Sequence, residues 1–486
     1  MTEQITPRLA RTGLGVADMV FFVVAAAAPL TVVAGIIPLA IRTGGMSAAY
    51  GYLVPGLVLV LFAVGFTAMS PFVRNAGAFY SYISYGLGKP MGVGGSILAV
   101  VSYNAMTICL IAAFAVYGQS LLLGFLGIDL PWWLIAAVGV AGITLLGYFK
   151  VTLGAKVLGI ALLLEVIVLV IYEVVVLATG GAGEGVAVEV FAPSVMLDPG
   201  FGAMLVLTAG GFIGFEATAL YAEEAHDPRR TVPRATYIAI GFLALFYTIS
   251  VWVIFIAYGT DGALETAASD DVAQMVFSSM AGYVGTWLAD AGQLLLCTSS
   301  FAAALAFHNA AARYHFTLGR ERIFPAAISR VSASHGSPVG GVILQAVITV
   351  TVLGIAALVG ADPYLVVFLW SAAPGVLGIL LLEAIAAVAI VAFFWRDRRG
   401  HGLWRVILAP ALAAAGLLTF VVLSVVQLDL LTAATPLVNA LLVIPLPLAL
   451  VLGIAIAVIM KRRDPAQYAR LNSIDAERET LAPASE

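Results

Sequence analysis

Apolar runs of about twenty residues and more recur along this 486-residue chain. A helix of about 20 apolar residues is long enough to cross the ~30 Å hydrocarbon layer of a bilayer. The runs are rich in Leu, Val, Ile, Ala and Gly and lack the period-two alternation of a membrane β-barrel. Only 10% of the residues are charged, whereas a soluble globule has about a quarter. The sequence therefore predicts an all-α polytopic membrane protein.

Twelve apolar segments can be separated along the chain. Prolines mark several of the boundaries: Pro90, Pro131, Pro228, Pro338 and Pro363 fall between the runs or at their starts. We expect transmembrane helices at about 17–40, 47–72, 91–123, 132–149, 153–179, 201–222, 235–258, 283–311, 338–360, 363–395, 405–427 and 433–460.

The cations fix an orientation for these twelve segments. If the N-terminus is cytoplasmic, all but one of the 23 lysines and arginines fall on the cytoplasmic side, and the exception is Arg42. The positive-inside rule then predicts an even number of crossings, with the N- and C-termini in the cytoplasm and the chain in the cell (inner) membrane. The loops on the opposite side carry carboxylates instead: Glu184, Glu189, Asp198, Asp261, Glu265, Asp270, Asp271 and Asp362.

Several classes of protein are disfavoured by what the sequence lacks. The two cysteines, Cys109 and Cys297, lie inside apolar runs, which excludes a disulfide framework and disfavours a metal site. The sequence contains no phosphate-binding loop after a strand, no nucleophile elbow and no metal-ligand cluster. We therefore expect no cofactor, no enzymatic activity and no nucleic-acid partner, and a carrier driven by an ion gradient or by exchange. A transport-incompetent sensor would need an appended soluble domain, and a channel would need a repeated pore motif.

Two of the predicted helices carry interruptions. The first segment places Pro29 after four alanines in mid-helix, where proline removes a hydrogen bond and clashes with the preceding turn. The sixth segment contains Gly210, Gly211 and Gly214, and glycine is unfavourable in a helix interior. The two interruptions lie five segments apart, as expected for two inverted five-helix repeats. Matching interruptions of this kind indicate a substrate site near the middle of the membrane.

The chemistry of an interrupted helix suits a zwitterion. The start of one half-helix presents N–H groups, which attract a carboxylate, and the end of the other presents carbonyls, which attract an ammonium. Unpaired backbone at this depth is tolerated only beside a cavity or a ligand. The alternative is that Pro29 only kinks its helix and the glycines only permit close packing.

Several motifs resemble one known family. Residues 211–216 read Gly-Phe-Ile-Gly-Phe-Glu, and residues 222–234 read Ala-Glu-Glu-Ala-His-Asp-Pro-Arg-Arg-Thr-Val-Pro-Arg. Residues 75–82 read Asn-Ala-Gly-Ala-Phe-Tyr-Ser-Tyr, and residues 313–320 read Arg-Tyr-His-Phe-Thr-Leu-Gly-Arg, followed by Pro325 and Gly336-Ser-Pro338. Together they resemble the permeases of the amino acid–polyamine–organocation (APC) superfamily over the first ten segments.

The resemblance implies a twelve-helix fold with a five-plus-five inverted-repeat core and discontinuous helices 1 and 6. It implies uptake or exchange of amino acids or amines by alternating access. Two features depart from the family: many relatives have a glycine-rich first interruption, and many proton-coupled relatives carry lysine where this chain has Glu165. The expected divisions are a cytoplasmic N-terminal segment (1–16), the first repeat (17–179), the second repeat (201–395), two additional helices (405–460) and a cytoplasmic tail (461–486).

The candidate substrate-binding residues lie in the two interruptions or at the same depth in other segments. They are Ala26, Ala27, Ala28, Pro29, Thr31, Tyr103, Gly210, Gly211, Phe212, Gly214, Phe215, Ser299 and Trp370, with Asn104 and Ser300 at similar depth. Within this set, Phe212 could gate the site or stack on a substrate, and its alternative role is packing.

Ionisable residues within a membrane are functional candidates. Glu165 lies 13 residues into the fifth segment, or ~20 Å along a helix, and Glu216 directly follows the second interruption. Without a cationic partner each must be protonated, hydrated or bound to a cation. We assign both as candidates for proton or cation coupling, with a structural role as the alternative. Glu383 is expected to be structural.

Other polar residues are expected to lie nearer the two surfaces. Glu173 and Asp290 should face water near the outer surface, and His308 and Asn309 should end the eighth segment near the cytoplasm.

The sequence therefore favours a proton-coupled amino acid importer acting on a small-molecule substrate in the bilayer. A polyamine or other organic-cation carrier or exchanger is the alternative, with Glu165 binding a distal ammonium. The substrate, the coupling ion and the oligomeric state are left open.

Overall fold

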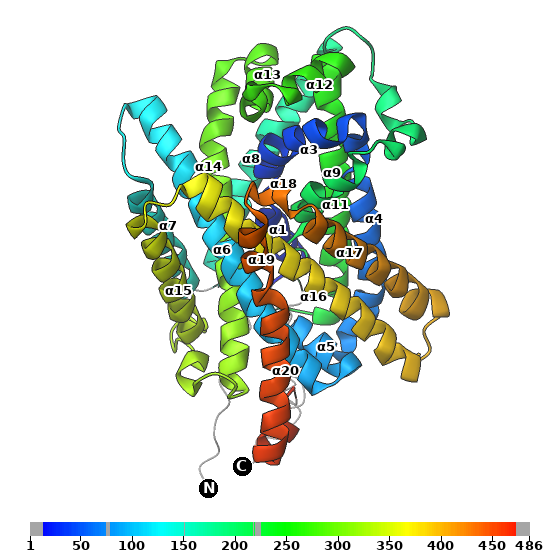
Figure 1. Ribbon diagram of the computed structural model, residues 1–486, viewed down its shortest axis with the longest axis vertical. Coiled ribbons are helices and arrows are strands. Elements are labelled where there is room, and N and C mark those ends of the chain that lie inside the picture. The colour runs from blue at the N-terminus through cyan, green and yellow to red at the C-terminus, as the bar shows by residue number, and fades with distance from the viewer. Residues whose placement is uncertain (1–12, 74–77, 150, 217, 219–224, 473–486) are drawn as a thin grey trace.

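The computed structural model describes residues 13–73, 78–149, 151–216, 218 and 225–472. Apart from an isolated bridge between Leu14 and Ala225, all regular structure in these ranges is helical (Figure 1). Within these described ranges, ten helices are long and apolar enough to cross a membrane. The predicted fourth and sixth segments form shorter apolar helices, Trp132–Tyr148 and Phe201–Phe212. The all-helical prediction is confirmed, and each of the twelve predicted segments contains helix.

The positions of the helices along the chain are close to those of the predicted segments. The first half contains α1 (Val16–Ala27), α2 (Pro29–Thr31), η1 (Val32–Ile36), α3 (Ile37–Gly44), η2 (Gly45–Tyr50), α4 (Leu53–Met69), η3 (Ser70–Phe72), α5 (Phe79–Leu87), α6 (Lys89–Leu126), α7 (Trp132–Tyr148), α8 (Val151–Thr179), η4 (Val188–Phe191) and η5 (Pro193–Leu197).

The second half begins with the second interrupted segment. It contains α9 (Phe201–Ala209), η6 (Gly210–Phe212), α11 (Pro228–Tyr258), α12 (Thr260–Ala268), η8 (Asp270–Gln274), α13 (Met275–Tyr283), α14 (Thr286–Arg320), η9 (Ala326–Ser329), α15 (Val339–Leu358), η10 (Pro363–Phe368), α16 (Leu369–Arg396), η11 (Trp404–Leu408), α17 (Ala409–Val426), α18 (Leu428–Thr432), α19 (Pro436–Val443), α20 (Pro445–Arg463) and α21 (Pro465–Arg470).

Prolines begin many of these helices. Pro90 lies in the first turn of α6, Pro228 begins α11, and Pro436 and Pro445 begin α19 and α20. A proline in the first turn loses no hydrogen bond, because the first N–H groups of a helix have no partner within it.

Successive connections between the segments lie alternately at the two opposite ends of the molecule. At one end, Trp252 Nε1 donates to the Val186 carbonyl at 2.7 Å, and the Tyr50 hydroxyl donates to the Phe191 carbonyl at 2.6 Å. These contacts join the connections that follow the first and fifth segments to the later part of the seventh. Figure 1 shows α12 and α13 at this end, and α5 and the end of α20 at the other.

The eighth segment is longer than predicted. The prediction ended it at residue 311, but α14 continues to Arg320. His308 and Asn309 therefore lie about three turns before the end of the helix and are buried. The prediction that they end the segment was wrong, because the next glycine that could stop the helix is Gly319. The sixth segment is described as helix only to Phe212, and its predicted continuation over 217–222 lies outside the described residues except for Thr218.

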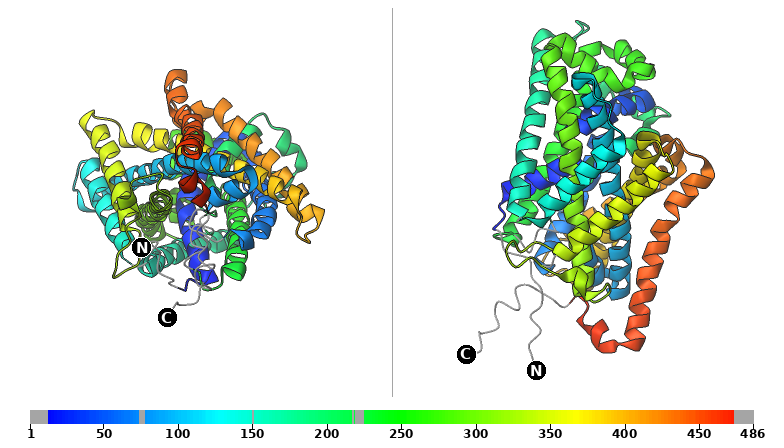
Figure 2. Two further views of the ribbon diagram at one scale, coloured as in Figure 1. Left: turned by 90° about the horizontal axis from the view of Figure 1, so that it is seen from below. Right: turned by 90° about the vertical axis from the view of Figure 1, so that its left-hand side faces the viewer.

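The helix α20 packs backbone to backbone on α6. It lies along one side of the molecule (Figure 2). A Cβ added to Gly453 of α20 would lie 2.6 Å from the Gly94 Cα atom of α6. Glycine is required at this contact because no side chain fits between the two backbones.

We therefore expect Gly453→Leu to lower the free energy of unfolding by about 2 kcal/mol, since overpacking typically costs 1–3 kcal/mol. Thermal unfolding in detergent measures the effect. Gly354→Leu in α15 is the matched control, because an added Cβ there meets nothing within 4 Å. Equal melting temperatures for the two variants would show that α20 does not make this contact.

Candidate functional site

The first interruption separates α1 from α2 at a single residue. Ala28 has φ 48° and ψ 70°, in the left-handed region that residues other than glycine seldom adopt. Pro29 follows as the first residue of α2. Proline disfavours the helical conformation in the residue before it, so the chain leaves the helix at Ala28 and begins a new one. Pro29 therefore starts a second half-helix, and does not simply kink a continuous one.

The second interruption follows α9. The chain passes through η6 to Ile213, which is extended with ψ 130°, and then to Gly214 with φ 119°. Gly214 is the position at which glycine is required, because L side chains rarely adopt such a φ value. Two residues later the Glu216 carboxylate turns back, and its Oε2 accepts a hydrogen bond from the Gly214 N–H at 2.8 Å.

The two interruptions lie in direct contact. A Cβ added to Gly214 would lie 2.6 Å from the Ala26 Cβ atom, and one added to Gly211 would lie 3.5 Å from the Val32 side chain. All of these residues are buried in the interior of the helix bundle. The interrupted segments thus bring the end of α1 and the residues after η6 to one place.

A first polar group lies on the α2 side of this contact. Glu165 of α8 is 2% exposed, and its Oε2 accepts hydrogen bonds from the Ser299 hydroxyl at 2.8 Å and from the Leu30 N–H at 3.4 Å. The Thr31 hydroxyl lies 3.5 Å from Ser299 Oγ. The free N–H groups at the start of a helix attract negative charge. Glu165 therefore occupies the anion-attracting end of the second half-helix.

A second polar group lies on the η6 side. The Tyr103 hydroxyl of α6 donates to Glu216 Oε1 at 2.6 Å, and the other oxygen of the same carboxylate accepts the Gly214 N–H. Glu383 of α16 is 1% exposed and lies within electrostatic reach of Glu216. Hydrogen bonds thus hold the Glu216 carboxylate at the second interruption, and a second buried carboxylate, Glu383, lies near it.

Aromatic rings cover the interruptions. The ring of Phe212 lies 6.2 Å from that of Tyr52 and 6.3 Å from that of Tyr247, and the rings of these two tyrosines are 5.0 Å apart. The Tyr247 hydroxyl also donates to the Ala27 carbonyl at 3.3 Å, near the end of α1.

Tyr52 and Tyr247 were not among the sequence candidates. Tyr247 lies in the long apolar helix α11 and Tyr52 directly precedes α4, and the sequence does not show which side chains of these segments meet the interruptions.

The structure brings most of the predicted residues to this place, but not all of them. The residues of both interruptions lie together with Tyr103, Thr31 and Ser299, as described above. Trp370 is half-buried in the first turn of α16, and within the described residues it makes no hydrogen bond or ring contact to either polar group. Asn104 and Ser300 donate hydrogen bonds to carbonyls within their own helices.

One carboxylate does not face water as expected. Glu173 is 6% exposed, and its Oε1 accepts a hydrogen bond from the Ser250 hydroxyl at 2.5 Å. The prediction that it faces water was wrong because α8 packs against α11 at this level. Asp290 is exposed, as predicted.

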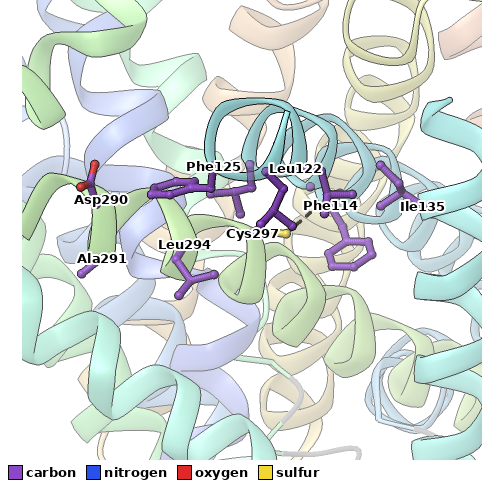
Figure 3. Close-up of a pocket in the computed structure, with 11 residues that line it drawn as sticks. Phe114, Leu122, Phe125, Ile135, Asp290, Ala291, Leu294 and Cys297 are labelled. Atoms are coloured by element: carbon purple, nitrogen blue, oxygen red, sulfur yellow. Dashed lines mark hydrogen bonds between the residues drawn. The ribbon is translucent and has the colours of Figure 1, made fainter. Parts of the chain in front are cut away.

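A separate cavity lies between α6, α7 and α14 (Figure 3). Its volume is about 540 Å³, and its lining includes Phe114, Phe125, Leu294, Cys297 and Asp290. The lining is apolar apart from the Asp290 carboxylate, and it includes none of the predicted substrate-binding residues. The cavity is therefore distinct from the two interruptions.

Comparison with known proteins agrees with this geometry. A family model described as amino acid permease matches residues 14–459, a range that contains both interruptions. This chain belongs to the amino acid permease family. The resemblance to the APC superfamily is thereby confirmed, and the chain is a multi-pass membrane protein of this family.

One relative is the branched-chain amino acid permease BcaP of Bacillus subtilis (strain 168), which is 24% identical over 317 residues. The alignment covers 61% of this chain and 64% of that protein, so the chain spans less than two thirds of the length of this relative.

Proposed function

We propose that this permease is a secondary active transporter that imports amino acids by alternating access, with the substrate held between the two helix interruptions. The contact between the interruptions, at Ala26 and Gly214, is the observation that carries the proposal. The carbonyls that end α1 suit a substrate ammonium, and the N–H groups that begin a half-helix suit its carboxylate. A relative described as a branched-chain amino acid permease supports Leu, Ile and Val as the first substrates to test.

The architecture in this proposal is the one that the sequence predicts. Twelve helices cross the inner membrane with both termini in the cytoplasm, residues 17–179 and 201–395 form inverted repeats, and 405–460 add two helices. Support comes from the connections that meet at opposite ends of the molecule and from the interruptions five segments apart.

Cysteine labelling tests the orientation. In a variant without Cys109 and Cys297, single cysteines at Arg230 and Arg399 should react with an impermeant maleimide only from the cytoplasmic side. A cysteine at Asp270 should react only from outside. Labelling of Arg230 and Asp270 from the same side would contradict the proposed number of crossings.

We propose that protons drive the import through Glu165, with Glu216 as the second candidate. Glu165 is buried, and within the described residues it forms no ion pair. A charged carboxylate is unfavourable there unless a proton or cation neutralises it. Its contacts join α8, α2 and α14, so a change in its charge would act on all three elements.

The Tyr103 hydroxyl should support transport through Glu216. Tyr103→Phe removes a donor to a buried carboxylate, and such a hydrogen bond contributes about 1.5–3 kcal/mol. We expect initial uptake rates to fall by roughly tenfold or more. Tyr50→Phe is the matched control, because the Tyr50 hydroxyl donates to the Phe191 carbonyl at the end of the molecule, away from the site. Unchanged uptake by Tyr103→Phe would remove this group from the mechanism.

The function itself is tested by uptake of radiolabelled amino acids into proteoliposomes. Saturable accumulation of an amino acid when the lumen is alkaline supports the proposal, and abolition by a protonophore identifies the coupling. The same assay with putrescine and other amines tests the organic-cation alternative, which the buried Glu165 carboxylate favours. Accumulation of amines without amino acids would replace the proposed substrate class.

A further inference from the structure

The chain after α20 turns back and lies against the end of the helix bundle. We define residues Asp464–Asn472 as the C-terminal strap. The turn is fixed at Asp464, whose Oδ1 accepts the Gln467 N–H at 2.9 Å, and α21 follows. The strap ends in Leu471, which is 1% exposed and packs with Tyr80 and Val93. A segment that buries an apolar side chain in this way is part of the folded molecule.

The strap is hydrogen-bonded to two different connections of the bundle. Lys89, at the start of α6, donates to the carbonyls of Tyr468 at 3.1 Å and Ala469 at 2.7 Å. The Gln467 amide donates to the Glu321 carbonyl at 3.2 Å, just after α14 ends. The strap therefore contacts both the connection that leads into α6 and the connection that leaves α14.

Asn472 joins these two connections directly. Its N–H donates to Glu321 Oε1 at 3.0 Å, and its side-chain Oδ1 accepts the Ser81 hydroxyl of α5 at 2.8 Å. Its φ of 57° is left-handed, a conformation that asparagine tolerates better than most residues. Burial raises the pKa of the Glu321 carboxyl, and the Asn472 N–H opposes this, followed by Arg320 and Lys89. One residue thus bridges α5 and the end of α14.

The helices next to these two connections have partly different neighbours. The helix α4, which precedes the α5 connection, packs against α11 and α17, whereas α14 packs against α6, α7 and α15, and α5 itself packs against α6 and α16. A transporter that works by alternating access moves one set of helices against the other. If α4 and α14 move in different sets, opening at this end separates the α5 connection from the end of α14, and the bridge through Asn472 opposes that separation.

We propose that the C-terminal strap is an intramolecular lock, which holds this end of the transporter closed and must release Ser81 or Glu321 before this end can open. The lock extends the proposed alternating-access function and rests on it. The surface formed by α5, the start of α6 and the end of α14 fits the chain's own residues 464–472.

A reversible cross-link tests the lock. In a variant without Cys109 and Cys297, Ser81→Cys and Asn472→Cys place two thiols at positions whose side-chain oxygens now lie 2.8 Å apart. Oxidation should form a disulfide and lower substrate transport by at least about tenfold, and a reductant should restore it. Each single-cysteine variant, treated with the same oxidant, is the control. Failure to form the disulfide, or full transport by the oxidised protein, would overturn the proposal.

Hydrogen–deuterium exchange tests the strap without any substrate. A variant that ends at Asp464 should exchange the amides of α5 and the start of α6 at least about tenfold faster than the full chain, because local opening becomes easier. A variant that ends at Asn472 keeps every strap contact named here and should match the full chain. Asn472→Ala should reproduce much of the effect of the shorter variant. Equal exchange rates in all of these proteins would overturn the proposed lock. Absence of amino acid transport by the wild-type protein would count only against the proposed function.

Discussion

Glu165→Gln should abolish accumulation of substrate driven by a pH gradient and leave exchange of substrate across the membrane intact. Glutamine keeps the shape of the side chain and can still accept hydrogen bonds from the Ser299 hydroxyl and the Leu30 N–H, but it cannot titrate. Proton-driven accumulation should fall to the level reached without a gradient, a loss of tenfold or more. Proteoliposome uptake with and without an inside-alkaline gradient measures the first quantity, and counterflow measures the second.

Glu173→Gln is the matched control for this experiment. Glu173 lies in the same helix and is also buried, but its partner is Ser250 and not a residue of either interruption. The control should accumulate substrate like the wild type. If Glu165→Gln weakens substrate binding itself, and does so most for diamines, the carboxylate binds a substrate ammonium. That result would support the organic-cation carrier. If Glu165→Gln accumulates substrate as the wild type does at every pH, Glu165 is structural and Glu216 is the next candidate.

Gly214→Val should abolish substrate binding and transport. Its φ of 119° is unfavourable for a β-branched residue, and its added Cβ would lie 2.6 Å from the Ala26 side chain. The left-handed strain costs about 1–2 kcal/mol and the overpacking a further 1–3 kcal/mol, so the two interruptions cannot keep their contact. Ligand-induced thermal stabilisation and uptake measure the result.

Gly202→Val in α9 is the matched control, because an added Cβ there meets only the Leu423 side chain, at 3.7 Å. We expect the control to bind and transport substrate. Normal binding by Gly214→Val would show that the contact between the interruptions is not needed for the site.

The interruptions could be predicted from the sequence because their causes are local. Pro29 lacks an N–H and restricts Ala28, and Gly214 adopts a backbone conformation that other residues avoid. Such causes act within a few residues, so the sequence predicts them without knowledge of packing. The burial of Glu165 followed for a similar reason, since it lies in the middle of a long apolar run.

The predictions that were wrong, and the features that were not predicted, depend on which helices pack against one another. Glu173 lies in the same helix as Glu165, but only the packing of α8 on α11 brings it to Ser250. Tyr247, in α11, and Tyr52, directly before α4, could not be chosen from among the many aromatic residues of these segments. The strap escaped prediction because Leu471 lies in a polar tail, where a single apolar residue does not indicate a buried position.

A structure of the purified permease with a saturating amino acid substrate would test the central claim most directly. Cryo-electron microscopy should show the substrate between the end of α1 and the residues after η6, with its ammonium near the carbonyls of Ala25–Ala27. Its carboxylate should face the N–H groups of the second interruption or of α2. Substrate density in the cavity between α6, α7 and α14, with Ala26 and Gly214 still in direct contact, would contradict the account.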